Sequence, residues 1–375
     1  MKSSLSFFIS MQRPPRCPRL AAKAPRAFTI LEMLVALVVL SVIVLISTQM
    51  IAGTSKLWIN SNSMMSEGRS ARVAFNSLTS RLSQATVAPY YGYTWTSSGT
   101  TNTPNAYVRH SELRFLSGPS TNINTSAPSS PTDAVFFVAP LGIISDTTDY
   151  GHLPSLLNIC GYYIQWTNVD VDRPSILPST GLPYHFQLMQ FVQPSEQMSL
   201  YSQTANNYPT YNPVTTTPAW QVTAMTNSPA GVRPIANNVI ALLLLPAMST
   251  TDTSGTLSPG FIYNSETNWT SATAATTAAN RTPPVMRVVM YTIDDISAKR
   301  LSTTYTNSTM PNLYVDTNGN TLFTDPAKLY PSTNSTNPDI GDLGRFEATL
   351  SAQKINFRRF EAAVQLPKQP WNTQN

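Results

Sequence analysis

Charged residues are scarce in this 375-residue chain: Asp, Glu, Lys and Arg make up 11% of it, against roughly 25% in an average soluble domain. Ser, Thr, Asn, Gln and Tyr must therefore carry the polar surface, as is common in exported proteins. The net charge of +5 comes from the first 27 residues, and acidic and basic residues nearly balance beyond them. A nucleic-acid-binding surface is therefore not expected. The early basic residues are Lys2, Arg13, Arg16, Arg19, Lys23 and Arg26.

Cysteine and histidine are nearly as scarce. Cys17 lies in the basic segment, so Cys160 is alone in the rest of the chain, which excludes an intramolecular disulfide and a cysteine-based metal site there. A free buried thiol is expected for Cys160. The sequence contains no H-E-x-x-H motif, no G-x-S-x-G elbow and no glycine-rich phosphate loop. We therefore expect a protein that is not an enzyme and needs no cofactor.

A long uncharged run follows the basic segment. Residues 33–46 read MLVALVVLSVIVLI, and no charge follows until Lys56. The run exceeds the roughly 7–15 apolar residues of a secretory signal and reaches the roughly 20 that cross a bilayer. Because basic residues favour the cytoplasmic side, we expect a single-pass anchor surrounded by inner-membrane lipid. Residues 1–27 are then a cytoplasmic leader, and the rest of the chain is exported.

The helix is expected to continue past the membrane. It covers residues 28–88, spans the membrane to about residue 52 and is amphipathic beyond it. Gly53 and Gly68 suggest a bend or a melted turn, and Pro89 ends the helix. The apolar face is formed by Ala71, Phe75, Leu78, Leu82 and Ala85.

Residues 89–375 are expected to form a β-rich head. Short runs rich in Val, Phe and Tyr alternate with long Ser/Thr/Asn/Pro loops, of which 94–106, 202–230 and 249–283 are examples. One long helix followed by strands predicts an α+β fold with an antiparallel sheet packed on the helix. The predicted strands are 112–116, 134–139, 162–167, 184–192, 239–245, 285–293, 314–316 with 321–324, and 357–364.

One carboxylate, Glu32, lies inside the apolar block. An ionised carboxylate in a bilayer costs up to about 3 kcal/mol at the centre, and less near the edge. Cleavage before Phe28 would create an α-amino group close to Glu32. In an assembly of similar subunits, Glu32 of one chain could neutralise that amine on its neighbour and set the axial register of the helices.

The residues around this position carry a family resemblance. The segment Ala27-Phe28-Thr29-Ile30-Leu31-Glu32 and the run behind it resemble the class III signal of type IV pilins and pseudopilins. The resemblance implies cleavage by prepilin peptidase between Ala27 and Phe28, methylation of the new Phe28 terminus and an assembly role for Glu32. Ala27 stands where the family usually has Gly.

The head also resembles known heads in outline. The order of Gly161-Tyr162-Tyr163, Val232-Arg233-Pro234 and Asn356-Phe357-Arg358 is similar to that in J-type minor pseudopilins of type II secretion. In size and loop content the chain is similar to the pilin-like Verru_Chthon cassette protein C. The resemblance implies a pilin-like fold and a minor subunit of a type IV pilus or type II secretion pseudopilus. Its partners would be other pilins or pseudopilins, with the head in the periplasm and then in the filament or at the cell surface.

Other motifs leave alternatives open. Asp316, Asn318 and Asn320 resemble the start of a calcium loop, but Asn-Gly between short strands favours a hairpin turn. Asp294-Asp295 is interpreted as a turn. Arg358-Arg359 is interpreted as a solvated strand face.

The aromatic clusters 90–95 and 162–166 are interpreted as sheet-on-helix packing, with a carbohydrate or partner surface as the alternative. The alternative function is accordingly that of an exported protein held in the membrane by a pilin-like anchor. Such a protein would be a module that binds carbohydrate or protein, or an enzyme.

Overall fold

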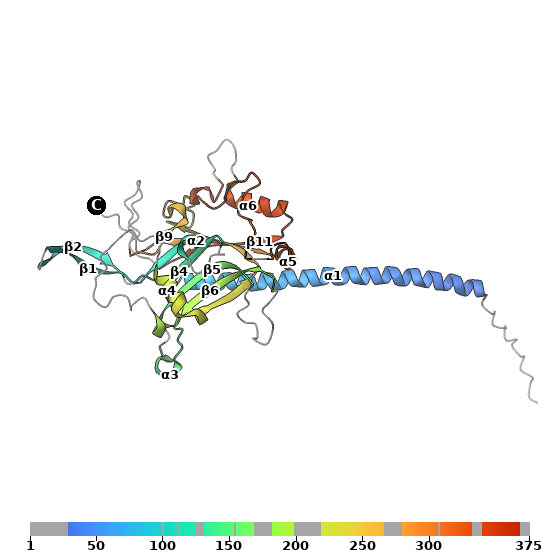
Figure 1. Cartoon of the computed structure of the whole chain (residues 1–375), viewed down its shortest axis with the longest axis horizontal. Helices are drawn as coiled ribbons and strands as arrows, with labels where there is room; N and C mark the ends of the chain where they lie inside the picture. The colour runs from blue at the N-terminus through green and yellow to red at the C-terminus, as the bar shows by residue number, and fades with distance from the viewer. Residues whose placement is uncertain are drawn as a thin grey trace, which may run out of the picture. The chain divides into compact units, whose positions relative to one another are not determined.

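The structure is a computed structural model. The chain divides into two compact units, Met1–Trp58 and Ile59–Asn375, and helix α1 (Ile30–Leu82) contributes residues to both of them (Figure 1). The residues that the structure describes are 29–98, 101–111, 113–124, 131–153, 155–168, 182–198, 219–265, 280–306, 308–331 and 340–367.

In the first unit, α1 is apolar on all sides and exposed. The segment Ile30–Ile59 is long and apolar enough to cross a membrane, and none of it is buried inside the protein. Its hydroxyls bond within the helix: Ser41 donates to the carbonyl of Val38 and Thr48 to that of Val44, both at 2.8 Å. Lipid offers no hydrogen-bond partner, so this internal pairing fits a single-pass membrane anchor.

The melted turn suggested at Gly53 and Gly68 is wrong, because α1 is helical at both positions. Gly68 has a different role. A Cβ atom at this position would lie 2.6 Å from Nη1 of Arg358, so the missing side chain leaves space for that guanidinium. The helix ends at Leu82 rather than at the expected residue 88.

In the second unit, one face of α1 is buried in the head. Phe75, Leu78 and Leu82 are each less than a tenth exposed, which confirms the predicted amphipathic face. The ring centroid of Phe75 lies 5.7 Å from that of Phe360. Burying each such side chain contributes about 1.5–3 kcal/mol, so this face fixes the helix to the sheet.

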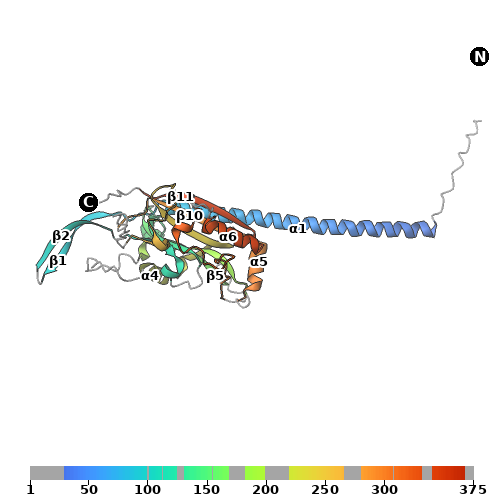
Figure 2. The ribbon, with the colours of Figure 1, turned by 90° about the horizontal axis from the view of Figure 1, so that it is seen from above.

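The larger sheet of the head has six strands in the order β7-β6-β5-β4-β3-β9, and each neighbouring pair is antiparallel (Figures 1 and 2). Its centre is nearly all buried, because β4 and β5 consist mainly of aliphatic and aromatic residues. The strands are β3 (Phe115–Pro119), β4 (Asp133–Pro140), β5 (Leu157–Thr167), β6 (His185–Gln193), β7 (Val232–Asn237) and β9 (Tyr263–Asn264).

A second antiparallel sheet has the order β11-β10-β8. Its strands are β8 (Val239–Ala247), β10 (Val285–Ile293) and β11 (Phe357–Gln365), and every residue of β8 is buried. Thr132, just before β4, and Asp133, the first residue of β4, bond to β8. The amide of Leu242 donates to Thr132 Oγ1 at 3.0 Å, and that of Leu244 donates to Asp133 Oδ2 at 2.8 Å. These bonds satisfy backbone donors of β8 and join the two sheets.

Most strand predictions are confirmed. The segments 134–139, 162–167, 184–192, 239–245, 285–293 and 357–364 correspond to β4, β5, β6, β8, β10 and β11. The strand expected at 112–116 overlaps β3, which begins at Phe115. The pair expected at 314–316 and 321–324 is reduced to one isolated bridge, between Val315 and Thr321.

Several elements were expected to be loops. Strands β1 (Tyr90–Ser98) and β2 (Thr101–His110) form a separate two-stranded sheet. Asp294 is not a turn residue: its carboxylate accepts the amide of Ser297 at 3.0 Å and caps the start of α5. The remaining helices are α2 (Ser120–Ile123), α3 (Thr147–Tyr150), α4 (Ala219–Asn227), α5 (Asp295–Thr304) and α6 (Gly341–Ala352).

Candidate functional site

The candidate site lies at the start of α1, where Glu32 and Thr29 bond reciprocally. The backbone amide of Thr29 donates to Glu32 Oε2 at 3.0 Å, and the amide of Glu32 donates to Thr29 Oγ1 at 3.3 Å. This is a capping box, in which a threonine before the helix and a glutamate three residues later satisfy each other's free amides. Glu32 therefore has a local structural role that its apolar surroundings did not reveal.

The capping box leaves the charge of Glu32 uncompensated within the described part of the chain. Its recorded partners there are the amide and hydroxyl of Thr29, and no ion pair joins it to a described basic residue. The negative charge does lie at the positive end of the helix dipole, a placement worth about 0.3–1 kcal/mol. A cation supplied from outside α1 would still find a carboxylate oxygen available, because Oε1 makes none of these recorded bonds.

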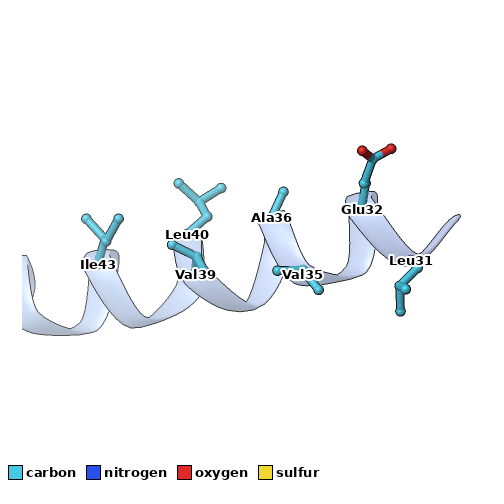
Figure 3. A pocket seen from close by; sticks show the side chains of 7 residues that line it. All are labelled: Leu31, Glu32, Val35, Ala36, Val39, Leu40 and Ile43. Atoms are coloured by element: carbon cyan, nitrogen blue, oxygen red, sulfur yellow. The ribbon is translucent and has the colours of Figure 1, made fainter. Parts of the chain in front are cut away.

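Glu32 begins a stripe of side chains on one side of the helix. Glu32, Ala36, Leu40 and Ile43 point in the same direction, as spacings of three and four residues require (Figure 3). Leu31, Val35 and Val39 complete the lining of a shallow open surface beside them. This surface belongs to a single helix and does not enclose a cavity. It suits packing against another apolar helix rather than the binding of a small molecule.

Two predicted processing residues, Ala27 and Phe28, lie outside the described residues. The described chain begins with Thr29, the second residue after the expected cut. Sequence reasoning identified Glu32 but missed Thr29 as its partner. The signal was present as the spacing T-x-x-E in Thr29-Ile30-Leu31-Glu32.

The weaker calcium candidates form a hydrogen-bonded turn. Asp316 Oδ1 accepts the amides of Asn318 and Asn320, both at 2.8 Å, and Oδ2 accepts Nδ2 of Asn320 at 3.0 Å. These bonds, led by that from the Asn320 side chain, hold the pKa of Asp316 below its usual value. Both carboxylate oxygens already have donors, and no group of three or more acidic, histidine or cysteine ligands occurs among the described residues. The geometry is that of an Asx-type hairpin turn.

The aromatic clusters behave differently from each other. Tyr162, Tyr163 and Trp166 are buried in β5, which confirms their predicted packing role. Tyr91 and Tyr93 are 50% and 55% exposed in β1, so the packing interpretation is wrong for that cluster. The second cluster is part of the core, whereas the first is available at the surface.

The acidic groups of the head mostly have structural partners. Glu361 accepts Nη2 of Arg287 at 2.9 Å and the hydroxyl of Tyr330 at 2.8 Å. Glu347 likewise accepts Nη1 of Arg359 at 3.0 Å, so Arg359 is paired rather than simply solvated. Cys160 is a buried free thiol, as predicted, and burial raises its pKa to about 11. A thiol in that state is a poor nucleophile.

The described parts thus form a membrane-length helix with a capped start and, in the second unit, an α+β head. Residues 23–48 match the family model described as the prokaryotic N-terminal methylation motif. This match supports a type IV pilin-like protein of the prepilin type, processed by prepilin peptidase and assembling with other pilins. No protein of curated function and no solved structure matches the chain.

Proposed function

We propose that this protein is a minor pilin-like or pseudopilin-like subunit of a type IV pilus or a type II secretion pseudopilus. Prepilin peptidase cuts it between Ala27 and Phe28 and methylates Phe28. Its role is assembly rather than catalysis, and it requires no cofactor. The head lies in the periplasm while α1 is held in the inner membrane, and the subunit then moves into a filament.

The observation that carries this proposal is the uncompensated carboxylate of Glu32 at the start of an exposed apolar helix. The exposed apolar surface of α1 needs lipid or other helices around it. When other helices replace lipid, a charge without a counter-ion favours the axial register of the helices in which a neighbour supplies that counter-ion. A terminal amine at Phe28 of a neighbouring subunit would supply that counter-ion.

The first experiment determines the N-terminal residue of the mature protein by mass spectrometry. A methylated Phe28 is expected when the protein is co-produced with prepilin peptidase. Protein produced without the peptidase is the control and should keep its leader. An uncut terminus in the presence of active peptidase, or a cut at another position, would contradict the proposal.

The second experiment separates the charge of Glu32 from its capping bond. Glu32→Gln keeps an oxygen that can accept the Thr29 amide but removes the charge. Thr29→Ala keeps the charge but removes the capping hydroxyl, at a cost of about 1 kcal/mol in helix stability. We expect both Glu32→Gln and Glu32→Ala to insert into the membrane and to be lost from the filament. Thr29→Ala should still assemble.

Cleavage of each variant is measured in the same samples, because Thr29 and Glu32 both lie close to the processing site. Only cut protein is counted when filament incorporation is compared. If cut Glu32→Gln assembles like the wild type and Thr29→Ala does not, the amine pairing is wrong. Glu32 would then act only as a cap of its own helix.

A further inference from the structure

The two-stranded sheet β1-β2 carries a strip of tyrosine rings that the assembly role does not use. Tyr91 and Tyr93 share one face of β1, and Tyr107 of β2 lies directly opposite Tyr93. The ring centroid of Tyr107 is 5.6 Å from that of Tyr91 and 5.1 Å from that of Tyr93. The three rings therefore form one continuous aromatic strip across both strands.

This strip is exposed. Tyr91, Tyr93 and Tyr107 are 50%, 55% and 60% exposed, respectively. Within the described residues no third strand pairs with β1 or β2 (Figures 1 and 2). An isolated two-stranded hairpin is marginally stable at best in water. The part of each ring that stays exposed adds apolar surface to this hairpin, and such surface often marks a binding site.

The composition of the hairpin restricts the chemistry of what it contacts. Residues 90–108 contain no acidic, basic or histidine residue, and nine of them are Ser, Thr or Asn; Arg109 and His110 end β2, where Arg109 pairs with Tyr91. Tyrosine rings offer an apolar face and a polar hydroxyl at low conformational cost, and Ser, Thr and Asn offer adaptable hydrogen bonds. The matching ligand is uncharged, has hydroxyl groups and presents patches of C–H.

We propose that the tyrosine strip of β1-β2 binds a neutral polysaccharide. The C–H faces of pyranose rings stack on Tyr91, Tyr93 and Tyr107, and the sugar hydroxyls bond to polar groups of the hairpin. Arg109 is the only Lys, Arg, Asp or Glu in the described strands β1 and β2, and an otherwise uncharged hairpin complements an uncharged polymer. An acidic polysaccharide or an anionic lipid surface would instead favour Lys and Arg at the contact.

Strand addition by a second copy of this chain fits the hairpin less well. Pro104 lies inside β2, opposite Trp95, next to a register shift. Proline removes a backbone donor, and an irregular register bends the strand, so both features make a poor template for another strand. The face of the hairpin, rather than its edge, is therefore the contact surface.

The test uses the full-length protein in a detergent without a sugar headgroup. Retention is measured by co-sedimentation with microcrystalline cellulose, chitin and mannan, three uncharged polysaccharides. We expect wild-type protein to bind at least one of them. The double variant Tyr93→Ala/Tyr107→Ala should bind that polymer at least about tenfold more weakly, equivalent to about 1.4 kcal/mol. The matched control is Tyr150→Ala, which removes a tyrosine of α3 that is 40% exposed.

Two further measurements separate lost binding from a lost hairpin. Tyr107→Phe keeps the ring and should retain most of the affinity. A soluble oligosaccharide of the bound polymer should slow amide hydrogen exchange in residues 90–98 and 101–110 of the wild type. Glu32→Gln should bind the polymer normally, so failure of assembly does not affect this result.

The proposal is overturned if the wild type binds none of the three polymers, or if the tyrosine variants bind as well as Tyr150→Ala does. It is also overturned if the tyrosines are needed only for sedimentation with anionic liposomes. The same holds if they are needed only for self-association in analytical ultracentrifugation. Those two outcomes would assign the strip to a membrane surface or to a second copy of this chain.

Discussion

Asp133 at the start of β4 provides a sharp test of how the two sheets of the head are joined. Its carboxylate accepts the amide of Leu244 at 2.8 Å and is 3% exposed. Burial raises the pKa of Asp133 to about 8, and the bond from Leu244 opposes that shift only in part. Near neutral pH the group is therefore largely protonated in the folded protein and ionised in the unfolded chain.

The sign of the pH effect follows from the two pKa values. In the unfolded chain Asp133 titrates near its usual value of 3.8, whereas in the folded protein it titrates near 8. Between these values the folded state binds more protons, so the free energy of unfolding falls by about 1.4 kcal/mol per pH unit. The contribution of the protonated Asp133 to stability is therefore complete below the unfolded pKa of 3.8. It is lost as the pH rises through the folded pKa of about 8.

The substitution Asp133→Asn removes this dependence with little change of shape. Its amide oxygen can accept the bond from Leu244, and its amide group occupies the place of the carboxylic O–H. As the pH rises from about 5 to about 7, the unfolding free energy of the variant should increase by about 2.7 kcal/mol relative to that of the wild type. The gain is measured by denaturant unfolding of the detergent-solubilised protein, followed by tryptophan fluorescence.

The control is Asp316→Asn in the turn 316–320. The pKa of Asp316 is lowered, chiefly by the bond from the Asn320 side chain. Its contribution is therefore present above 3.8 and is lost only as the pH falls through the lowered value. The difference between Asp316→Asn and the wild type should be constant from about pH 5 to about pH 8. Parallel pH curves for Asp133→Asn and the wild type would refute a protonated, buried Asp133.

Three further predictions concern packing and ions. Gly161→Ala should destabilise the head by about 1–3 kcal/mol in denaturant unfolding, because the new Cβ would overlap the ring of Phe136; an unchanged midpoint would contradict this. Phe346→Ala should lower the free energy of unfolding by about 3–5 kcal/mol, since that ring is fully buried and its centroid lies 5.1 Å from that of Tyr291. A decrease below about 1 kcal/mol would show that neighbouring side chains fill the space that the ring leaves. Calcium should not raise the melting temperature, because the Asp316 carboxylate already accepts three N–H bonds; a rise that Asp316→Asn abolishes would prove otherwise.

The parts of the fold that sequence predicted are those where one physical signal dominates. The bounds of β10 agree with the predicted strand 285–293, because its Val, Met, Tyr and Ile residues are all buried and only Arg287 interrupts the buried run. The buried face of α1 at Phe75 and Leu78 was equally plain, since its apolar spacing matches the helical repeat. The anchor was predicted from length and the absence of charge alone.

The missed elements lack such a signal. In the hairpin β1-β2, the frequent Ser, Thr and Asn and the proline at 104 are typical of a loop, and pairing between the two strands overrides that preference. Helix α6 begins with Gly341 and contains Gly344, which lowers its intrinsic helix propensity. Its burial of Phe346 against the sheet decides the outcome, and that contact cannot be read from a local window.

The sequence predicted the charged residue of the candidate site, Glu32, but not the hydrogen bonds that hold it. The interpretation of Glu32 rests on the cost of a carboxylate in lipid, and that cost gives no information about the cap of the helix. The capping box joins the two. Thr29 holds Glu32 through Oε2 at the first turn, so the carboxylate has a fixed position before any neighbour arrives. A pre-positioned charge loses less conformational entropy on pairing than a free side chain does.

That fixed position also limits how Glu32 can act. If the carboxylate turned away to reach a neighbouring amine with both oxygens, the amide of Thr29 would lose its acceptor, a cost of about 1–3 kcal/mol where water is excluded. Pairing through Oε1 alone avoids this cost and keeps the capping box intact. Assembly through Oε1 therefore requires the neighbour's amine to approach from the side of the helix that carries Ala36 and Leu40 (Figure 3). The apolar stripe and the charge then belong to one interface, because the helix that covers the stripe is placed to present its amine to Glu32.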